Sequence, residues 1–171
     1  SGKTTVTLGL LAALTRRGVA VAPAKVGPDY IDTAILGRAA GRPAVNLDHW
    51  AMSAERLRSL ASAHAATADL LLVEGVMGLF DGAADGRGST ADLAKTLGLP
   101  VILVLDAERQ SQSIAALAHG FVTWRSDIRV AGLVVDQATR FGRLPSNDRA
   151  DPGELLRAHH RGLGVGPGEQ E

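Results

Sequence analysis

Four short runs of consecutive apolar residues constrain the fold of this 171-residue chain more than any other feature. They are, in chain order, VAVAPAKV at 19–26, DLLLVEG at 69–75, PVILVLD at 100–106 and VAGLVVD at 130–136. Apolar residues that follow one another without alternation predict parallel strands that are covered on both faces. Segments with helical spacing separate the runs, at 6–18, 33–40, 53–66, 90–97 and 111–124. The alternation predicts a doubly wound α/β domain with a mostly parallel sheet.

The composition argues against several classes of protein. Lys and Arg number 18, as do Asp and Glu, so the formal charge is zero and gives no electrostatic case for nucleic acid or a membrane surface as partner. Cysteine is absent, which excludes disulfides, thiolate metal sites and a Cys nucleophile within this chain. No stretch approaches the roughly 18 uninterrupted apolar residues of a membrane span, and no signal-peptide pattern opens the chain. We therefore expect a cytoplasmic protein.

The opening residues SGKTT match the end of a phosphate-binding loop. In the pattern G-x-x-x-x-G-K-[ST], backbone amides surround the phosphates, the Lys reaches the outer phosphates and the hydroxyl holds magnesium. Gly2, Lys3 and Thr4 supply the last three fixed positions, in front of a predicted helix whose N-terminus favours a phosphate. The rest of the loop and its strand would lie upstream, so we expect a sheet that lacks its first strand. An ordinary Gly-Lys-Thr helix start is the alternative.

Acids and lysines gather where the predicted strands end. Lys25, Asp29 and Asp32 stand in KVGPDYID, and Glu74 and Asp81 stand in VEGVMGLFDG. Ligands of open α/β sheets bind beyond the carboxyl ends of the strands. A magnesium-bound triphosphate needs cations for its oxygens and carboxylates for the metal or its waters. Each residue alone has a structural explanation, such as Asp32 as a helix cap, but together they predict a site for ATP and Mg²⁺.

Five motifs along the chain belong together: KVGPDYID at 25–32, NLD at 46–48, VEGVMGLFDG at 73–82, GSTA at 88–91 and SIAAL at 113–117. Together they resemble the N-terminal domain of cobyrinic acid a,c-diamide synthase. The resemblance runs from residue 1 to about residue 135 and implies a P-loop NTPase fold. It also implies an ATP-dependent amidation in cobalamin biosynthesis, with a corrinoid tetrapyrrole as substrate. ATP would phosphorylate the a- and c-side-chain carboxylates of cobyrinic or hydrogenobyrinic acid, and ammonia would displace the phosphate from each acyl phosphate.

The resemblance also implies roles for the residues that match the nucleotide motifs. Gly2 would belong to the phosphate loop, and Lys3 would hold the outer phosphates. Thr4 would bind magnesium, and Thr5 would contact an inner phosphate. Lys25 would add a second cation at the transferring phosphoryl group.

Acidic residues complete the implied site. Asp32 and Glu74 would coordinate Mg²⁺, directly or through water. Asp29 and Asp81 would shape the site of the corrinoid or of the intermediate. Asp136 stands where the family has an Asn that both donates to and accepts from adenine. Because an ionised Asp only accepts, the base preference stays open.

The chain departs from the family in its C-terminal part. Family members carry a glutaminase domain with a Cys nucleophile, and this chain has neither the length nor a cysteine for it. Ammonia would then come from a glutaminase domain that is absent here. We expect residues 1–136 to form a partial P-loop domain of a chain truncated at both ends, and the Gly- and Pro-rich residues 137–171 to form a divergent, poorly ordered tail.

Other functions stay open at this point. A relative that amidates a nickel tetrapyrrole would carry the same motifs. An ATP-driven switch of the MinD/ParA type shares the GKTT helix and works by dimerisation, so a homodimer is a further expectation. Such a switch would need an additional Lys early in the phosphate loop. An inactive remnant of a gene is the third alternative, and a sheet without its central strand would leave apolar faces uncovered and have marginal stability.

Overall fold

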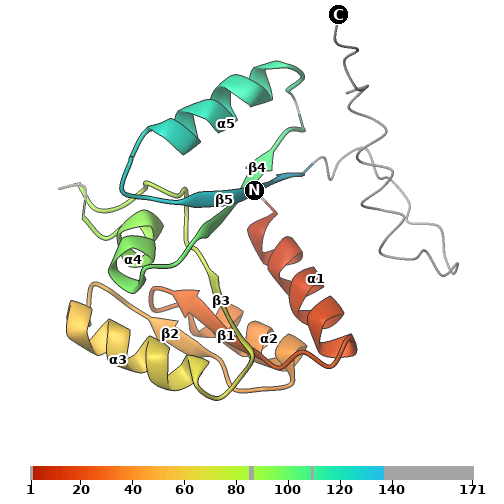
Figure 1. Cartoon of the computed structure of the whole chain (residues 1–171), viewed down its shortest axis with the longest axis vertical. Helices are drawn as coiled ribbons and strands as arrows, with labels where there is room; N and C mark the ends of the chain where they lie inside the picture. Colours follow the sequence, from red (N-terminus) through yellow and green to blue (C-terminus); the bar gives the residue numbers. More distant parts are fainter. Residues whose placement is uncertain (1, 85–86, 109, 137–171) are drawn as a thin grey trace, which may run out of the picture. The chain divides into compact units, whose positions relative to one another are not determined.

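The computed structural model describes residues 2–84, 87–108 and 110–136 (Figure 1). Helices alternate with strands throughout these ranges. In chain order the elements are α1 Lys3–Arg16, β1 Val21–Val26, α2 Tyr30–Ala40, β2 Val45–Leu47, α3 Ala54–Ala65, β3 Leu70–Glu74, α4 Thr90–Leu97, β4 Val101–Asp106, α5 Ser113–Thr123 and β5 Val130–Asp136. The predicted tail at 137–171 lies outside the described residues.

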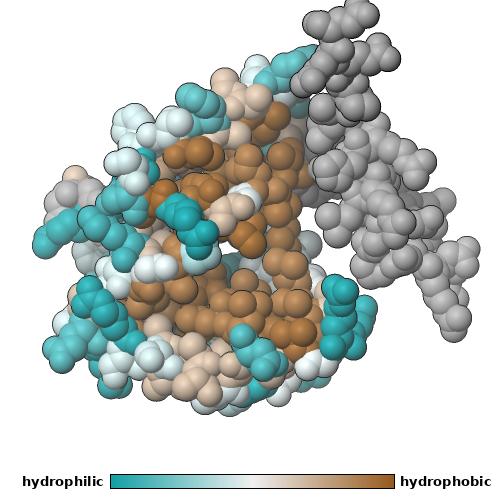
Figure 2. Space-filling model, in the orientation of Figure 1, coloured by the Kyte–Doolittle hydropathy of each residue, from teal (hydrophilic) through white to brown (hydrophobic). Residues whose placement is uncertain are grey.

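All strand pairs are parallel, which confirms the predicted α/β class. The strands form two hydrogen-bonded sheets, one of order β2-β1-β3 and one of order β4-β5. The predicted single sheet is thus divided, because no hydrogen-bonded ladder joins β3 to β4 in the described part of the chain. Leu70 on β3 and Ile102 on β4 are 42% and 55% exposed, so apolar side chains near this division remain accessible. Figure 2 shows apolar surface on this view of the molecule.

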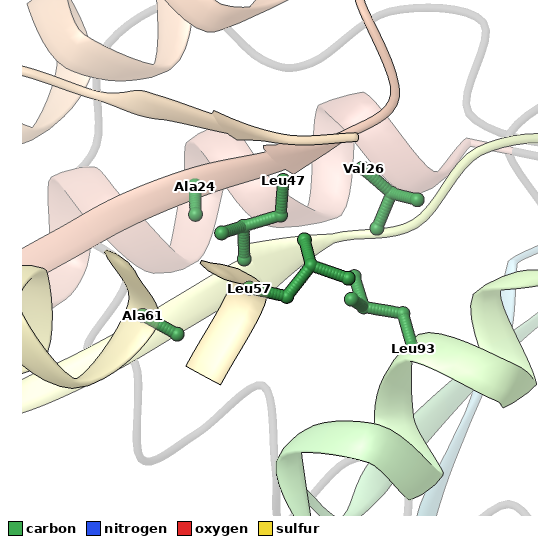
Figure 3. Close-up of a cluster of buried hydrophobic side chains, with 6 residues drawn as sticks. All are labelled: Ala24, Val26, Leu47, Leu57, Ala61 and Leu93. Atoms are coloured by element: carbon green, nitrogen blue, oxygen red, sulfur yellow. The ribbon is translucent and has the colours of Figure 1, made fainter. Parts of the chain in front are cut away.

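Helices cover both faces of the three-stranded sheet. Successive strand residues point to opposite faces, and Val21 of β1 packs with Leu11 of α1 and Leu36 of α2. On the other face, Ala24 and Val26 belong to a core cluster with side chains from β2, α3 and α4 (Figure 3). The remaining members of that cluster are Leu47, Leu57, Ala61 and Leu93. The sheet is therefore doubly wound, as predicted.

Helix α4 connects this sheet to the second one. Its Leu93 belongs to the cluster of Figure 3, whereas its Ala91 packs with Leu103 and Leu105 of β4. Helix α5 completes the second cluster, where Phe121 stacks on Phe80 with ring centroids 5.7 Å apart. No helix in the described ranges has the length and apolar character needed to cross a membrane.

One local prediction needs correction, and one short strand was not predicted. The helix expected from residue 33 begins at Tyr30, because the Asp29 side chain caps it by accepting hydrogen bonds from the N–H groups of Ile31 and Asp32. Asp32 therefore lies in the first turn and is not the cap. Strand β2 was not predicted, since it is only three residues long and a run of that length has no distinctive pattern.

Helix α4 provides a test of how capping stabilises this fold. Ser89 is 1% exposed and forms a reciprocal capping box with Asp92, whereas Ser53 caps α3 with a single bond to the Arg56 N–H. We expect Ser89→Ala to lower the free energy of unfolding by about 1–2 kcal/mol and Ser53→Ala by about 0.5–1 kcal/mol. Urea unfolding measures both, and equal losses would contradict the structural role of the box.

Candidate functional site

The carboxyl ends of β1, β2 and β3 lie at one edge of their sheet, because all three strands are parallel. A cavity of about 470 Å³ opens at this edge, within the size range of small-molecule sites. Its lining residues come from the start of α1 and from the segments that end or follow β1 and β3. They are Gly2, Lys3, Thr4, Thr5, Lys25, Asp29, Asp32, Glu74, Gly75, Val76 and Met77. Most residues singled out from the sequence therefore meet at one place.

A row of polar residues crosses the sheet just before the strands end. Lys25 on β1 is in register with Asn46 on β2 and with Glu74 on β3. Register partners in parallel strands share one face, and the alternation along β1 places Lys25 on the face of Val21, which α1 and α2 cover. The row therefore lies on the face of the sheet that α1 covers, and the start of α1 lines the cavity on that face.

Lys25 is the buried cation of the site. It is 4% exposed, and its Nζ donates to Asp32 Oδ2 at 2.7 Å and to Glu74 Oε1 at 3.0 Å. Burial by itself would lower the pKa of Lys25, but the hydrogen bonds and charges of Asp32 and Glu74 outweigh burial and raise that pKa above its ordinary value. Lys25 is therefore an ammonium at physiological pH.

Glu74 is the buried anion and has one carboxylate oxygen without a partner. Its Oε1 accepts from Lys25 and from the Thr4 hydroxyl, the latter at 2.6 Å. Its Oε2 is buried and has no hydrogen-bond partner among the described residues. An unsatisfied buried carboxylate oxygen costs free energy, so the site is suited to receive a donor or a cation at this atom.

The oxygen donors fit Mg²⁺ bound together with phosphate. Thr4, Asp32 and Glu74 supply a hydroxyl and two carboxylates to the cavity. No group of three or more His, Cys, Asp or Glu residues that could hold a metal occurs in the ranges described above. Mg²⁺ usually keeps several waters and binds one or two carboxylates together with substrate phosphates.

The N-terminus of α1 forms one side of the cavity. Gly2 precedes the helix with a φ of 64°, and the first turn has neither a side-chain cap nor an acidic residue. The first N–H groups of a helix lack intrahelical partners and favour an anion. Lys3 Nζ donates to the Met77 carbonyl at 2.8 Å, and Met77 has a φ of 48°, which is uncommon for a residue with a side chain.

The other predicted site residues are placed differently. Asp29 lines the cavity, but its Oδ1 is occupied by the cap of α2. Asp81 is not among the lining residues, and its Oδ2 accepts from the Gly78 N–H at 2.8 Å. Asp136 is the last residue of β5 and is in register with Asp106 of β4. The chemical roles assigned to these three residues stay predictions.

Sequence reasoning did not assign roles to two anchoring side chains. The amide of Asn46 donates to the Gly27 carbonyl at 2.7 Å and to the Asp29 carbonyl at 3.0 Å. The Thr90 hydroxyl bonds both the N–H and the carbonyl of Val76, at 3.1 Å each. Asn46 and Thr90 both belong to motifs that carry the family resemblance, NLD at 46–48 and GSTA at 88–91. Those motifs gave no role to either side chain, because the bonds to Gly27, Asp29 and Val76 depend on the folded chain.

With this geometry in hand, comparison with known proteins places the chain in a class. Residues 1–147 match the model of the CobQ/CobB/MinD/ParA nucleotide-binding domain, and the chain belongs to this family. The description of this family names a nucleotide as the ligand of the domain.

Three relatives are identical to this chain at more than half of the aligned residues. The chain is 56% identical over 137 residues to hydrogenobyrinate a,c-diamide synthase of Rhizobium meliloti (strain 1021) and 58% identical over 137 residues to that of a Sinorhizobium species. It is 57% identical over 138 residues to that of Brucella anthropi. Each match covers 80% of this chain and 32% of the relative, so the chain spans about a third of the length of these relatives.

The ion pair between Lys25 and Glu74 generates a stability prediction. Lys25→Met leaves a buried carboxylate without its cation, so we expect a loss of about 3–5 kcal/mol in the free energy of unfolding. Lys25→Met combined with Glu74→Gln removes both charges and should recover part of that loss. Lys95→Met, at a lysine whose side chain is 59% exposed, is the control and should change the free energy by less than about 1 kcal/mol.

The same pair predicts a pH dependence. Because the pKa of Lys25 is raised in the folded protein, its contribution is complete below the ordinary lysine pKa of about 10.4 and is lost as the pH rises through the raised value. The difference in unfolding free energy between wild type and Lys25→Met should therefore shrink only in alkaline solution. A difference that shrinks between pH 6 and 9 would contradict a charged Lys25.

Proposed function

We propose that this chain binds ATP with Mg²⁺ in the cavity and activates carboxylates of a corrinoid for amidation. The observation that carries the nucleotide part is the convergence of Lys3 and Lys25 with Thr4, Asp32 and Glu74 on one cavity at a helix N-terminus. The substrate part is supported by the relatives, which are named hydrogenobyrinate a,c-diamide synthases. Hydrogenobyrinic acid is accordingly the substrate of choice for a test, with cobyrinic acid second.

The reaction needs activation because a carboxylate is a poor electrophile. Transfer of the γ-phosphoryl group of ATP to a carboxylate oxygen forms an acyl phosphate and releases ADP. Ammonia then attacks the carbonyl carbon and loses one proton, while inorganic phosphate leaves with the electron pair of the broken C–O bond and takes up that proton. The chain's contribution is to hold the reacting groups in place and to stabilise phosphate charge. Such stabilisation is the main task of phosphoryl-transfer sites.

Two lysines supply the positive charge in this proposal. Lys3 stands at the helix N-terminus and binds the outer phosphates, exchanging its contact with the Met77 carbonyl for phosphate oxygens. Lys25 has three N–H donors, of which two bond Asp32 and Glu74. The third is directed to the transferring phosphoryl group. Its two acidic partners keep Lys25 charged and hold it in position.

Oxygen donors bind the metal in this proposal. Thr4, Asp32 and Glu74 hold Mg²⁺, directly or through water, and the unpartnered Oε2 of Glu74 is the strongest argument for a cation there. Bound Mg²⁺ supplies neutralisation of phosphate charge. Gly2 permits close approach of the phosphates, and Thr5 contacts an inner phosphate.

The remaining assignments concern substrate and partners. Asp29 and Asp81 shape the corrinoid site by fixing the loops after β1 and β3, and Asp136 accepts a hydrogen bond from the amino group of the base. Ammonia is supplied by a glutaminase domain, as the resemblance to the synthase family implies. The amidation is proposed to take place in the cytoplasm.

Nucleotide titration tests the site directly. Wild-type protein should bind a fluorescent ATP analogue more tightly with Mg²⁺ than without it. Lys3→Ala should weaken binding about 10–100-fold, because a charge-assisted hydrogen bond contributes about 1.5–3 kcal/mol. Glu74→Gln should abolish most of the gain from Mg²⁺ while leaving metal-free binding in place. Lys95→Ala removes an exposed lysine outside the cavity and should bind like wild type. Equal binding by wild type and Lys3→Ala would refute the assignment of the phosphate loop.

Trapping of the acyl phosphate tests the reaction. The chain is incubated with ATP, Mg²⁺, hydrogenobyrinic acid and either ammonium salt or hydroxylamine. Mass spectrometry should detect amides with ammonium and hydroxamates with hydroxylamine, in amounts that depend on Lys3. ADP release that is independent of the tetrapyrrole, with neither product formed, would count against the substrate while leaving the nucleotide site intact.

A further inference from the structure

Asn46 is the third member of the polar row, and its side chain bonds to the main chain rather than lining the cavity. Lys25 and Glu74 contact each other, and both line the cavity. Asn46 is in register with Lys25 but is not among the lining residues. Its amide nitrogen instead donates to two main-chain carbonyls, at Gly27 and Asp29. Asn46 therefore contacts the segment between β1 and α2.

These bonds fasten the segment to β2 at several points. The Gly27 N–H donates to the Leu47 carbonyl at 3.0 Å, and the Gly27 carbonyl accepts from Asn46. Gly27 has a φ of 84°, so the chain turns sharply here in a conformation that suits glycine. The next contact is at the Asp29 carbonyl, directly before α2 begins. The first turn of α2 is thus attached to β2 by hydrogen bonds as well as to β1 through the chain itself.

That turn carries Asp32, whose carboxylate must reach Lys25. The Asp29 side chain bonds the N–H groups of Ile31 and Asp32, so the position of Asp29 determines that of the turn. Asp32 is 28% exposed at its side chain and bonds Lys25 at 2.7 Å. Displacement of the Asp29 main chain would therefore move a carboxylate that we assign to the metal.

We propose that Asn46 is a positioning residue that sets Asp32 for metal binding, and thereby determines how much Mg²⁺ the site requires. The inference rests on the proposed function, since it presumes that Asp32 serves a magnesium-bound nucleotide. Its chemistry depends on an amide. Both contacts of Asn46 are carbonyl oxygens, so only a donor fits. An ionised Asp, which only accepts, would face two oxygens without a proton to share.

The test is a titration of Mg²⁺ into the full chain with a fluorescent ATP analogue present. Loss of a residue that orients a metal ligand typically weakens metal binding by about 10–100-fold. We expect Asn46→Ala to raise the half-saturating Mg²⁺ concentration about tenfold and Asn46→Asp to raise it further. In a background of Asp32→Asn, adding Asn46→Ala should change that concentration less than about twofold, because residues that act through one another are not additive.

Thr33→Val is the matched control. The Thr33 hydroxyl bonds the same Asp29 carbonyl at 2.5 Å, but from within α2, so its loss leaves the attachment to β2 intact. Its Mg²⁺ requirement should equal that of wild type. Hydrogen exchange gives a readout without nucleotide: the Ile31 and Asp32 amides should exchange faster in Asn46→Ala, while those of α3 keep their rates. Asn46→Ser, whose shorter side chain has one donor, replaces Asn46→Ala if the latter does not fold.

Each outcome is decisive. A tenfold effect that persists with Asp32→Asn, or an unchanged Mg²⁺ requirement in both Asn46 variants, overturns the positioning role and leaves the proposed function standing. If Thr33→Val raises the half-saturating Mg²⁺ concentration as much as Asn46→Ala does, Asn46 only stabilises α2, and the positioning role is again overturned. A wild-type chain that binds the analogue without any response to Mg²⁺ overturns this inference together with the metal part of the proposed function.

Discussion

The buried pair of Lys25 and Glu74 is the interaction on which the rest of the site depends. Burying two charges has a desolvation cost that two apolar side chains of equal volume do not have. A buried ion pair is therefore weak evidence that the protein is stable. The arrangement of the pair is informative because neighbouring helices contribute side chains that bond to each member of it. Asp32 and Thr4 each contact one member, from α2 and α1 respectively. Two helices on one face of the sheet thus converge on a cation and an anion that adjacent parallel strands hold in register.

The segments that follow β1 and β3 are held by side chains outside the cavity. Asn46 bonds the segment after β1, and Thr90 bonds the segment after β3 through both polar groups of Val76. Loops of α/β folds carry function on a rigid scaffold, and here the attachment uses main-chain atoms. The geometry of the site is therefore distributed over β2 and α4 as well as over the elements that form the cavity.

Much of this arrangement could be predicted from sequence, and the exceptions have physical causes. Continuous apolar runs located four of the strands, and the rule that ligands bind beyond strand ends singled out Lys25 and Glu74. Strand β2 was missed because three residues show no period. The role of Asn46 could not be predicted, since its partners lie 17 and 19 residues earlier and meet it only through the pairing of β1 with β2. The start of α2 was placed late because a cap, rather than apolar spacing, determines it.

The contacts of Lys3 and Thr4 have a consequence for ligand affinity. Lys3 bonds the Met77 carbonyl, and Thr4 bonds the Glu74 carboxylate. In the function proposed above, an incoming triphosphate would therefore have to displace the Met77 carbonyl from Lys3 and the Glu74 carboxylate from Thr4. The dissociation constant of such a complex would include the free energy of breaking those internal bonds, so a variant without them would bind the same nucleotide more tightly. The Met77 carbonyl and the Glu74 carboxylate would thereby limit the affinity of the protein for such a ligand.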